Sequence, residues 1–388
     1  MPNALRAEAV PAAVRDVLAV LRAHDHEAWL VGGCVRDLLR GVAVADFDVA
    51  TSAAPEAVLA LFPKAVPIGI RHGTVMIPTR NGPLDVTRFR AGGTLRDDLA
   101  HRDFTVNAMA WDPASGEFAD PAGGAQDLAA GRLRAVGSAR ERFEEDPLRA
   151  LRAARIGAAL GLEPDASIEP AMKDARLPLR KVARERVRRE LEALLLAPGV
   201  EAGLALLRRS GIEADLAPGT RENGGALAAA LPLELPLRLA AWLRGTHAES
   251  ILLRLRFPRR VVATVARLVA LHPIDARRLR GDADVRRLVS RVGEQGIEEL
   301  LLLREAEIRV GGDSAAQREA LAILRERIDR VQRVGELAID GATVMATLGC
   351  APGPEVGAAL HYLTDCVLED PTCNTREALI EKLVRRKP

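Results

Sequence analysis

Two aspartates, Asp46 and Asp48, stand one residue apart within the otherwise apolar run from Ala45 to Ala50. Alternate residues of a strand project from the same face, so a strand here would set the two carboxylates side by side. Carboxylates that close raise each other's pKa unless a cation lies between them. A divalent metal ion with oxygen ligands is the natural cation. The pair therefore predicts a metal site, although a solvated strand edge would carry the same pattern.

Two further features indicate what such a metal would serve. Asp85 lies in a predicted strand with Leu84 and Val86 on the opposite face, which makes a third carboxylate available. The Gly32-Gly33 pair follows an apolar run and begins a predicted helix, whose first N–H groups can bind phosphate. A plain strand-to-helix turn would explain the glycines alone. Carboxylates, a metal and a phosphate cradle together describe phosphoryl or nucleotidyl transfer.

Asp146 and Arg149 are three residues apart in a predicted helix and are therefore neighbours, as in an ordinary surface ion pair. The pair can also read a base, because aspartate accepts hydrogen bonds and arginine donates them. Cytosine and adenine present an amine beside a bare ring nitrogen, whereas guanine and uracil present the opposite pattern. Such a pair accepts C and A and rejects G and U without a template. Arg152 and Arg155 continue at the same spacing and can reach phosphates.

The stretch His101-Arg102-Asp103-Phe104-Thr105-Val106-Asn107-Ala108 offers supporting groups. Arg102 could meet a triphosphate, and Asp103 and Asn107 are expected to cap or hold other side chains. An ordinary surface turn before a helix is the alternative for each.

Composition limits the classes of protein that the chain can belong to. Its 388 residues are enough for two to four domains, and the net charge of +2 does not by itself indicate a nucleic-acid partner. The arginines are clustered, and clusters can bind phosphate locally, although solvated helix faces are favoured for the last of the three: Arg149, Arg152 and Arg155; 184–189; Arg277, Arg278 and Arg280. The four cysteines lack zinc spacing, and neither a secretory signal nor a membrane-spanning run is evident, so a reduced, cytoplasmic, soluble protein is expected.

The hydrophobic pattern predicts an α/β region followed by a helical one. In the first region it predicts a helix at 11–27, strands at 28–31 and 46–50, a helix at 35–39, and a hairpin of 73–79 and 84–89 around Asn81-Gly82. From Ser138 onward the period is helical, with one long helix at 140–160 that Pro147 breaks near its start, and another at 185–196. We therefore expect an α+β fold with four parts: a catalytic head at 1–137, a helical neck at 138–200, a helical body at 201–272 and a helical tail at 273–388.

Six motifs occur in an order that resembles class II tRNA nucleotidyltransferases and the related bacterial poly(A) polymerases, within the polymerase β-like superfamily. They are Gly32-Gly33-x-Val35-Arg36-Asp37; Asp46-x-Asp48; Arg102-Asp103-Phe104-Thr105-x-Asn107-Ala108; Asp120-Pro121 with Gly123-Gly124 and Asp127-Leu128; Glu145-Asp146-x-x-Arg149; and Glu185-Arg186-x-x-x-Glu190.

The resemblance implies a head, neck, body and tail, and a role for each matched residue. Asp46 and Asp48 would hold two magnesium ions, one activating the RNA 3′-hydroxyl and one neutralising the triphosphate, with Asp85 as a supporting carboxylate. The hydroxyl would attack the α-phosphate of CTP or ATP and expel pyrophosphate. The remaining roles are implied in the same way: Gly33, Arg36 and Arg102 would contact triphosphate and sugar; Asp146 and Arg149 would read the base; Arg152 and Arg155 would complete the nucleotide site; Glu185, Arg186 and Glu190 would brace the neck.

One departure from the family concerns the number of nucleotides added. Only the residues from Arg90 to His101 separate Phe89 from Arg102, where relatives that add the full C-C-A sequence usually carry a longer loop. The short segment modestly favours an enzyme that adds only the two cytidines to the tRNA 3′ end. A poly(A) polymerase is the alternative within the fold, but its basic C-terminal extension is not matched by Arg385-Arg386-Lys387-Pro388. An inactive RNA-binding module is the alternative of another class.

Overall fold

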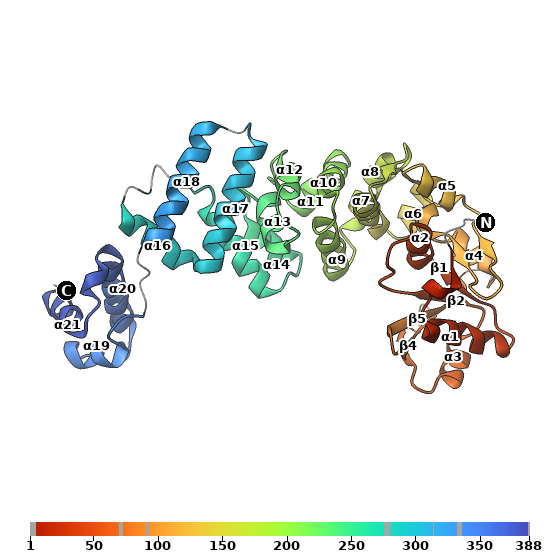
Figure 1. Cartoon of the computed structure of the whole chain (residues 1–388), viewed down its shortest axis with the longest axis horizontal. Helices are drawn as coiled ribbons and strands as arrows, with labels where there is room; N and C mark the ends of the chain where they lie inside the picture. The colour runs from red at the N-terminus through yellow and green to blue at the C-terminus, as the bar shows by residue number, and fades with distance from the viewer. Residues whose placement is uncertain are drawn as a thin grey trace. The chain divides into compact units, whose positions relative to one another are not determined.

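The computed structural model describes residues 5–69, 73–90, 93–274, 279, 281–312, 314–331 and 336–386. The chain forms two compact units that divide after Pro218 (Figure 1). The first unit carries both sheets, and the second is built from helices throughout its described residues. A mixed sheet followed by helices confirms the expected α+β class. The predicted four-part division at residues 137, 200 and 272 stays a prediction, and Arg277, Arg278 and Arg280 lie outside the described residues.

The main sheet has seven strands in the order β3-β4-β5-β2-β1-β6-β7. Strands β2 and β5 are parallel, and the other neighbours are antiparallel. The bounds are β1 Ala28–Val31, β2 Asp48–Thr51, β3 Val66–Gly69, β4 Thr74–Thr79, β5 Gly82–Arg88, β6 Ala110–Trp111 and β7 Phe118–Ala119. The predicted strand at 46–50 is displaced, since β2 begins at Asp48 and Asp46 precedes it. The hairpin is present, with Thr79 paired to Gly82, so its turn lies one residue earlier than predicted.

One face of the sheet is covered by helices α1 (Ala12–Ala23), α2 (Gly33–Leu39) and α3 (Pro55–Leu61). Their apolar residues share one core with the inward side chains of the hairpin, Val75, Ile77, Leu84 and Val86. Because successive strand residues alternate between faces, Asp85 is left on the other, half-buried face. The face of β2 and β5 that carries Asp48 and Asp85 is therefore the one opposite the helix-covered core.

The other face of the sheet packs against α4 through Leu99, and further helices of the first unit follow along the chain. Their bounds are α4 Leu95–Ala100, α5 Gly124–Ala129, α6 Ala139–Glu145, α7 Leu148–Leu160, α8 Ile168–Leu179, α9 Arg184–Leu195, α10 Val200–Arg209 and α11 Ile212–Leu216, with short helices η1 Ala7–Ala9 and η3 Thr105–Asn107. A two-stranded sheet of β8 (Arg132–Leu133) and β9 (Glu163–Pro164) completes the unit. The predicted helix at 140–160 is two helices, with the expected break at Pro147 because proline lacks the N–H that an unbroken helix requires.

The second unit comprises α12 Gly224–Ala229, α13 Leu235–Trp242, α14 Ala248–Arg254, α15 Arg259–Leu271, α16 Asp282–Val292, α17 Glu294–Val310, α18 Ala315–Arg330, α19 Gly341–Leu348, α20 Pro354–Glu369, η4 Pro371–Cys373 and α21 Arg376–Arg385. The last three helices pack around an apolar cluster of their own that includes Val344, Leu363 and Leu379. No described helix has both the length and the apolar character needed to cross a membrane.

Candidate active site

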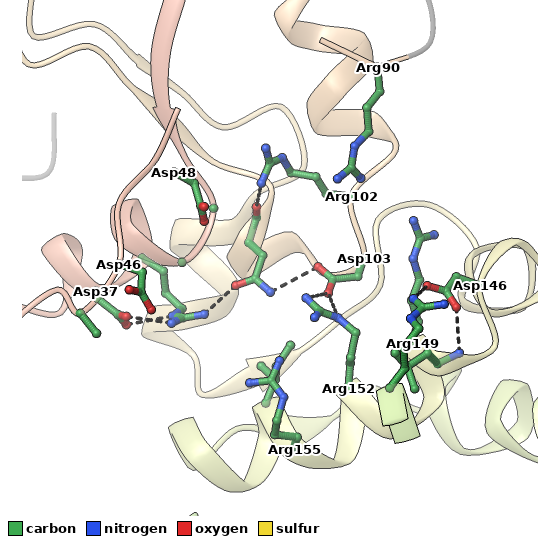
Figure 2. A pocket seen from close by; sticks show the side chains of 18 residues that line it. Asp37, Asp46, Asp48, Arg90, Arg102, Asp103, Asp146, Arg149, Arg152 and Arg155 are labelled. Atoms are coloured by element: carbon green, nitrogen blue, oxygen red, sulfur yellow. Dashed lines mark hydrogen bonds and ion pairs between the residues drawn. The ribbon is translucent and has the colours of Figure 1, made fainter. Parts of the chain in front are cut away.

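A cavity of about 660 Å³ opens between the sheet, α2, α7 and the segments around Arg102 and Asp146 (Figure 2). Its walls are strongly charged, with seven arginines and five aspartates: Arg36, Arg90, Arg102, Arg149, Arg152, Arg155, Arg186, Asp37, Asp46, Asp48, Asp103 and Asp146. The excess of arginines suits a ligand with several negative charges, such as a triphosphate. We call this space the first cavity.

The parallel pairing of β2 with β5 positions the carboxylates. Asp48 lies opposite Asp85 in the register, and Asp46 precedes the strand by two residues. Asp46 and Asp48 line the first cavity, whereas Asp85 does not. Unlike the other three aspartates of the cavity, neither carboxylate forms a hydrogen bond or ion pair with any part of the chain that the structure describes. Two unpaired carboxylates face the cavity together.

The carboxyl groups of Asp48 and Asp85 ionise less readily than an ordinary aspartate. Asp48 is solvent-exposed in the cavity, but the protein around it reduces the solvation of its carboxyl group and so raises the pKa of that group. The charge of Arg102 opposes the rise, while those of Asp85 and Asp46 add to it. Desolvation and the charge of Asp46 likewise raise the pKa of Asp85. A bound cation would relieve this repulsion, so the site is suited to one.

The donor set fits magnesium. Within the described residues, no three His, Cys, Asp or Glu side chains converge closely enough to hold a metal ion unaided. Magnesium, however, is usually bound by one or two carboxylates together with substrate phosphates, not by a complete protein cage. Asp46 and Asp48 supply the two carboxylates, and the arginine-lined cavity has room for the phosphates. Asp85 stays a predicted supporting carboxylate.

Arg102 is held in place from α4. Its Nε and Nη2 donate to one oxygen of Asp98 across 3.0 and 2.9 Å, and Asp98 is only 1% exposed. Its Nη1 approaches Gly32, where an added Cβ would lie 2.8 Å from that nitrogen. Gly32 also has φ +77°, a conformation that favours glycine. The first glycine of the Gly32-Gly33 pair therefore makes room for Arg102.

A chain of polar contacts joins α2 to α7. Arg36 donates to both oxygens of Asp37, and its Nη1 donates to the side-chain oxygen of Asn107 across 2.7 Å. The amide of Asn107 donates in turn to Asp103 across 3.2 Å, and Asp103 accepts two bonds from Arg152 (Figure 2). Asp103 and Asn107 thus contact arginines of the cavity, and their supporting role stays a prediction.

The series of polar contacts ends on α9. Glu190 pairs with Arg155 across 2.5 Å and with Arg152 across 3.5 Å. Both arginines line the first cavity. Glu190 therefore links α9 to α7 while orienting two predicted nucleotide-binding residues. Glu185, its predicted partner in bracing the neck, lies exposed in the first turn of α9.

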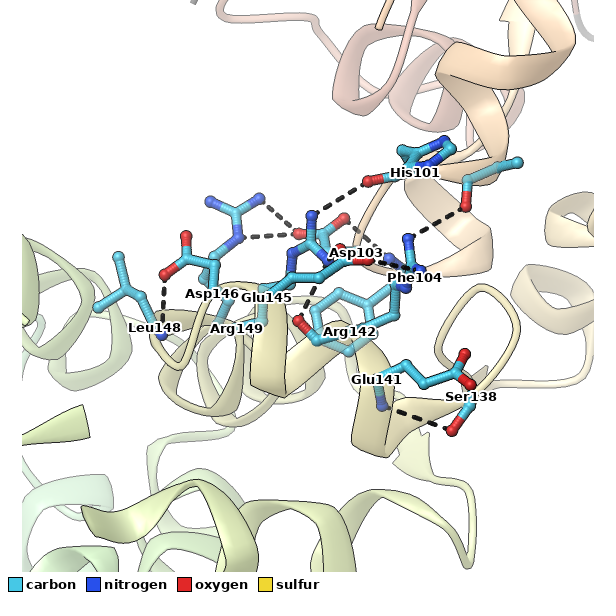
Figure 3. Close-up of polar contacts among 12 residues, drawn as sticks. His101, Asp103, Phe104, Ser138, Glu141, Arg142, Glu145, Asp146, Leu148 and Arg149 are labelled. Atoms are coloured by element: carbon cyan, nitrogen blue, oxygen red, sulfur yellow. Dashed lines mark hydrogen bonds and ion pairs between the residues drawn. The ribbon is translucent and has the colours of Figure 1, made fainter. Parts of the chain in front are cut away.

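Asp146 and Arg149 lie across the cavity from Asp46 and Asp48 (Figure 2), and Figure 3 shows the polar contacts around them. They do not share a helix, since Asp146 ends α6 and Arg149 lies in the first turn of α7. Asp146 accepts from the N–H of Leu148, and Arg149 donates to Glu145 and to the carbonyls of Arg142 and His101. Their side chains are therefore fixed by other partners and not by each other, which keeps both available to a base.

The structure adds residues that the sequence did not single out. Arg186 was expected only to brace the neck, but it donates to Asp146 across 2.8 Å and lines the cavity. Asp98 and Arg90 were not assigned. The spacing of Asp98 four residues before Arg102 could have indicated their contact on a helix. Arg90 lies two residues after the end of β5, and only the fold places it beside Arg102 and Arg149.

Comparisons with known proteins agree with this geometry. Residues 28–134 match the family described as "Poly A polymerase head domain", and residues 161–223 match "Probable RNA and SrmB- binding site of polymerase A". The head is thus that of a polynucleotide-extending transferase. Residues 237–383 match the family described as tRNA nucleotidyltransferase domain 2.

The relatives narrow the class further. A CCA-adding enzyme of Geobacillus stearothermophilus is 33% identical, with 95% of this chain and 96% of the relative covered. A CC-adding tRNA nucleotidyltransferase of Shouchella clausii is 34% identical over the same shares. The solved structure of the Bacillus stearothermophilus CCA-adding enzyme in complex with CTP matches with a TM-score of 0.77 and 31% identity, covering 96% of each chain. The chain belongs to the family of CCA-adding and CC-adding tRNA nucleotidyltransferases and is an enzyme.

Proposed function

We propose that this enzyme adds cytidine to the 3′ end of tRNA without a template, and that it stops after the second C. The observation that carries the activity is one cavity that holds two unpaired carboxylates opposite an Asp/Arg pair. The carboxylates serve the transfer, and the pair selects C, or C and A, from the four nucleotides. CTP, and ATP if the full sequence is made, are the nucleotide substrates, and pyrophosphate is the second product.

Different residues of the cavity would serve metal binding, phosphate binding and base recognition. Asp46 and Asp48 would hold two magnesium ions, which would neutralise the triphosphate and lower the pKa of the attacking hydroxyl. Arg102, fixed by Asp98, and Arg36, fixed by Asp37, lie beside Gly33 where they can bind the phosphates and sugar. Arg149 uses three of its five N–H donors on the protein, which leaves two for a base.

Two features support C-C as the product in preference to C-C-A. Strand β5 ends at Arg88 and α4 begins at Leu95, with Thr94 capping it, so the connection is short. The alignment with the CC-adding relative spans 377 positions and that with the CCA-adding relative 401, although each covers 95% of this chain. The CC-adding relative therefore aligns with fewer gaps. The segment between Phe89 and Arg102 is thus shorter than the loop that, by the family resemblance, helps the base site change from C to A.

The experiment supplies magnesium, single nucleotides and tRNAs truncated at the 3′ end. A tRNA that lacks its terminus should gain two residues from CTP, and a tRNA that already ends in C-C should gain nothing from ATP. Efficient addition of A to that tRNA would identify a full CCA-adding enzyme. Long tails from ATP alone on arbitrary RNA would instead identify the poly(A) polymerase that the head domain also allows.

A further inference from the structure

Four helices of the second unit, α12, α13, α15 and α17, pack together (Figure 1) and share a cluster of polar side chains. We call it the polar cluster. Its five side chains come from four places in the sequence: Asn223 before α12, Arg244 after α13, His272 after α15, and Arg304 and Glu307 on α17. The polar cluster therefore connects helices that are distant along the chain.

Glu307 carries the one negative charge of the polar cluster. It accepts hydrogen bonds from Arg244 and, across 2.5 Å, from Arg304. Arg244 also donates to the side-chain oxygen of Asn223 across 2.9 Å, so the carboxylate on α17 is connected to the start of α12. The side chain of Arg244 is only 8% exposed. A buried guanidinium depends on its carboxylate partner, so a change in the position of Glu307 would destabilise the polar cluster.

His272 is buried beside this carboxylate without a hydrogen bond. Its side chain is 2% exposed, and neither ring nitrogen has a hydrogen-bond partner within the part of the chain that the structure describes. Its Nε2 lies 3.5 Å from Oε2 of Glu307, the same oxygen to which Arg304 donates. A neutral imidazole has one donor and one acceptor nitrogen, whereas a protonated one has two donors and a charge. A protonated His272 would therefore compete with Arg304 for this oxygen.

The surroundings of His272 oppose that protonation. Its charged neighbours among the described residues come from three places: Glu307 and Arg304 on α17, Arg244 after α13, and Arg221 before α12. Burial lowers the pKa of His272 to about 4, the charge of Glu307 opposes this shift, and the three guanidinium groups add to it. The ordinary histidine pKa is about 6.5, so the unfolded chain accepts a proton at pH values where the folded unit excludes it.

We propose that His272 is an acid-sensitive latch of the second unit. When the ring takes up a proton, it draws Glu307 away from Arg304, and the packing of α15 against α17 loosens. Because the folded protein favours the neutral ring, the polar cluster contributes its full stability above about pH 6.5 and loses it as pH falls toward about 4. The second unit should therefore open before the first on acidification. This inference goes beyond the proposed function, because the residues of the first cavity belong to the first unit.

Urea unfolding of the full chain between pH 7.5 and pH 5 tests the latch, with hydrogen exchange in α15 and α17 assigning the transition to the second unit. His272→Gln removes the titrating group, and the comparison with the wild type cancels the titration of all other groups. Relative to this variant, the equilibrium constant for opening of the wild type should rise about 30-fold over the range, as pKa values of about 4 and about 6.5 require.

His247→Gln is the matched control, because His247 is an exposed histidine of the same unit. It should follow the wild type at every pH. A difference between the wild type and His272→Gln that stays constant with pH would overturn the proposal, as would loss of exchange protection in α7 before α15 and α17. His272→Leu is a second variant in case His272→Gln does not fold, because the ring nitrogens make no hydrogen bond that leucine would lose.

A measurement on the wild type needs no substitution. The ring signal of His272 is followed by NMR from pH 7.5 to pH 4. It should stay that of a neutral imidazole down to about pH 5 while α15 and α17 remain protected from exchange. Protonation with a midpoint near the ordinary value of about 6.5 in a second unit that stays fully protected would overturn the latch, because the folded unit would then hold the proton without cost.

Discussion

Arg186 donates a hydrogen bond to the carboxylate of Asp146 across 2.8 Å and so joins α9 to the junction of α6 and α7. Asp146 also accepts the N–H of Leu148, so both of its oxygens have a fixed partner. A carboxylate has about four lone-pair positions, and those that remain can accept from the amine of a base. Arg186 therefore orients the acceptor of the predicted base-reading pair without occupying all of it.

Replacing Arg186 by Ala should affect nucleotide selection more than stability. The side chain of Arg186 is 52% exposed and that of Asp146 is 31% exposed. Ion pairs at the surface contribute less than about 1 kcal/mol to the free energy of folding. We expect KM for CTP to rise several-fold and the preference for CTP over UTP to fall, with an almost unchanged Tm. Arg189→Ala on the exposed side of α9 is the control. Equal KM values for CTP in the two variants would argue against an orienting role.

Arg149→Ala should loosen base choice more than it slows the chemistry, because the carboxylates on the far side of the cavity are untouched. A hydrogen bond from a charged donor contributes about 1.5–3 kcal/mol, so discrimination between CTP and UTP should fall by roughly 10- to 100-fold. Single-turnover incorporation of each of the four nucleotides measures this directly. An unchanged ratio of the four rates in the variant would remove Arg149 from base recognition.

Replacing Asp48 by Asn should have opposite effects on thermal stability without metal and with magnesium. Its pKa is raised in the folded protein, so ionisation there destabilises the native state at pH values above the ordinary aspartate pKa of about 3.9. In a chelator at pH 7, Asp48→Asn should therefore raise Tm, and the gain should vanish as pH falls below about 4. Added magnesium should stabilise the wild type and not this variant.

Activity completes that test. Asp46→Ala and Asp48→Asn should each lower incorporation by about a thousandfold or more while CTP still binds, because the arginines of the first cavity remain. Asp16→Asn, on the exposed side of α1, should match the wild type in both assays. Full incorporation by Asp46→Ala would show that the metal assignment is wrong.

The sequence predicted the family and the enzyme class, but it did not predict the contacts that position the candidate site residues. Asp46, Asp48, Asp146 and Arg149 could be singled out as candidates from the sequence, because each lies in a short motif whose residue types and spacing are local. Spacing could not reveal that Asp146 and Arg149 hold other partners, since Pro147 breaks the helix between α6 and α7. Contacts between distant segments, such as Arg152 with Asp103 or Arg186 with Asp146, depend on how the elements pack and leave no periodic trace.

The pair Asp103–Arg152 allows the most stringent test of the chain of polar contacts between α2 and α7. Asp103 is 7% exposed and Arg152 donates to it from Nε and Nη2 across 2.8 and 2.6 Å. Burial alone would raise the pKa of Asp103, but the charge and hydrogen bonds of Arg152, with the N–H of Phe104 and the amide of Asn107, hold it below the ordinary value. The ionised carboxylate is thus favoured in the folded state.

A lowered folded pKa stabilises the native state above the unfolded pKa of about 3.9, and this stabilisation is lost as pH falls toward the folded value. Asp103→Asn should therefore cost about 2 kcal/mol at pH 7, because Arg152 loses its closest partner and keeps Glu190, 3.5 Å away. The gap from the wild type should narrow as pH falls below about 4. Urea unfolding across this range measures the gap, with hydrogen exchange in α7 assigning the transition to the first unit. A gap that stays constant with pH would mean that Arg152 does not hold Asp103 in its ionised form.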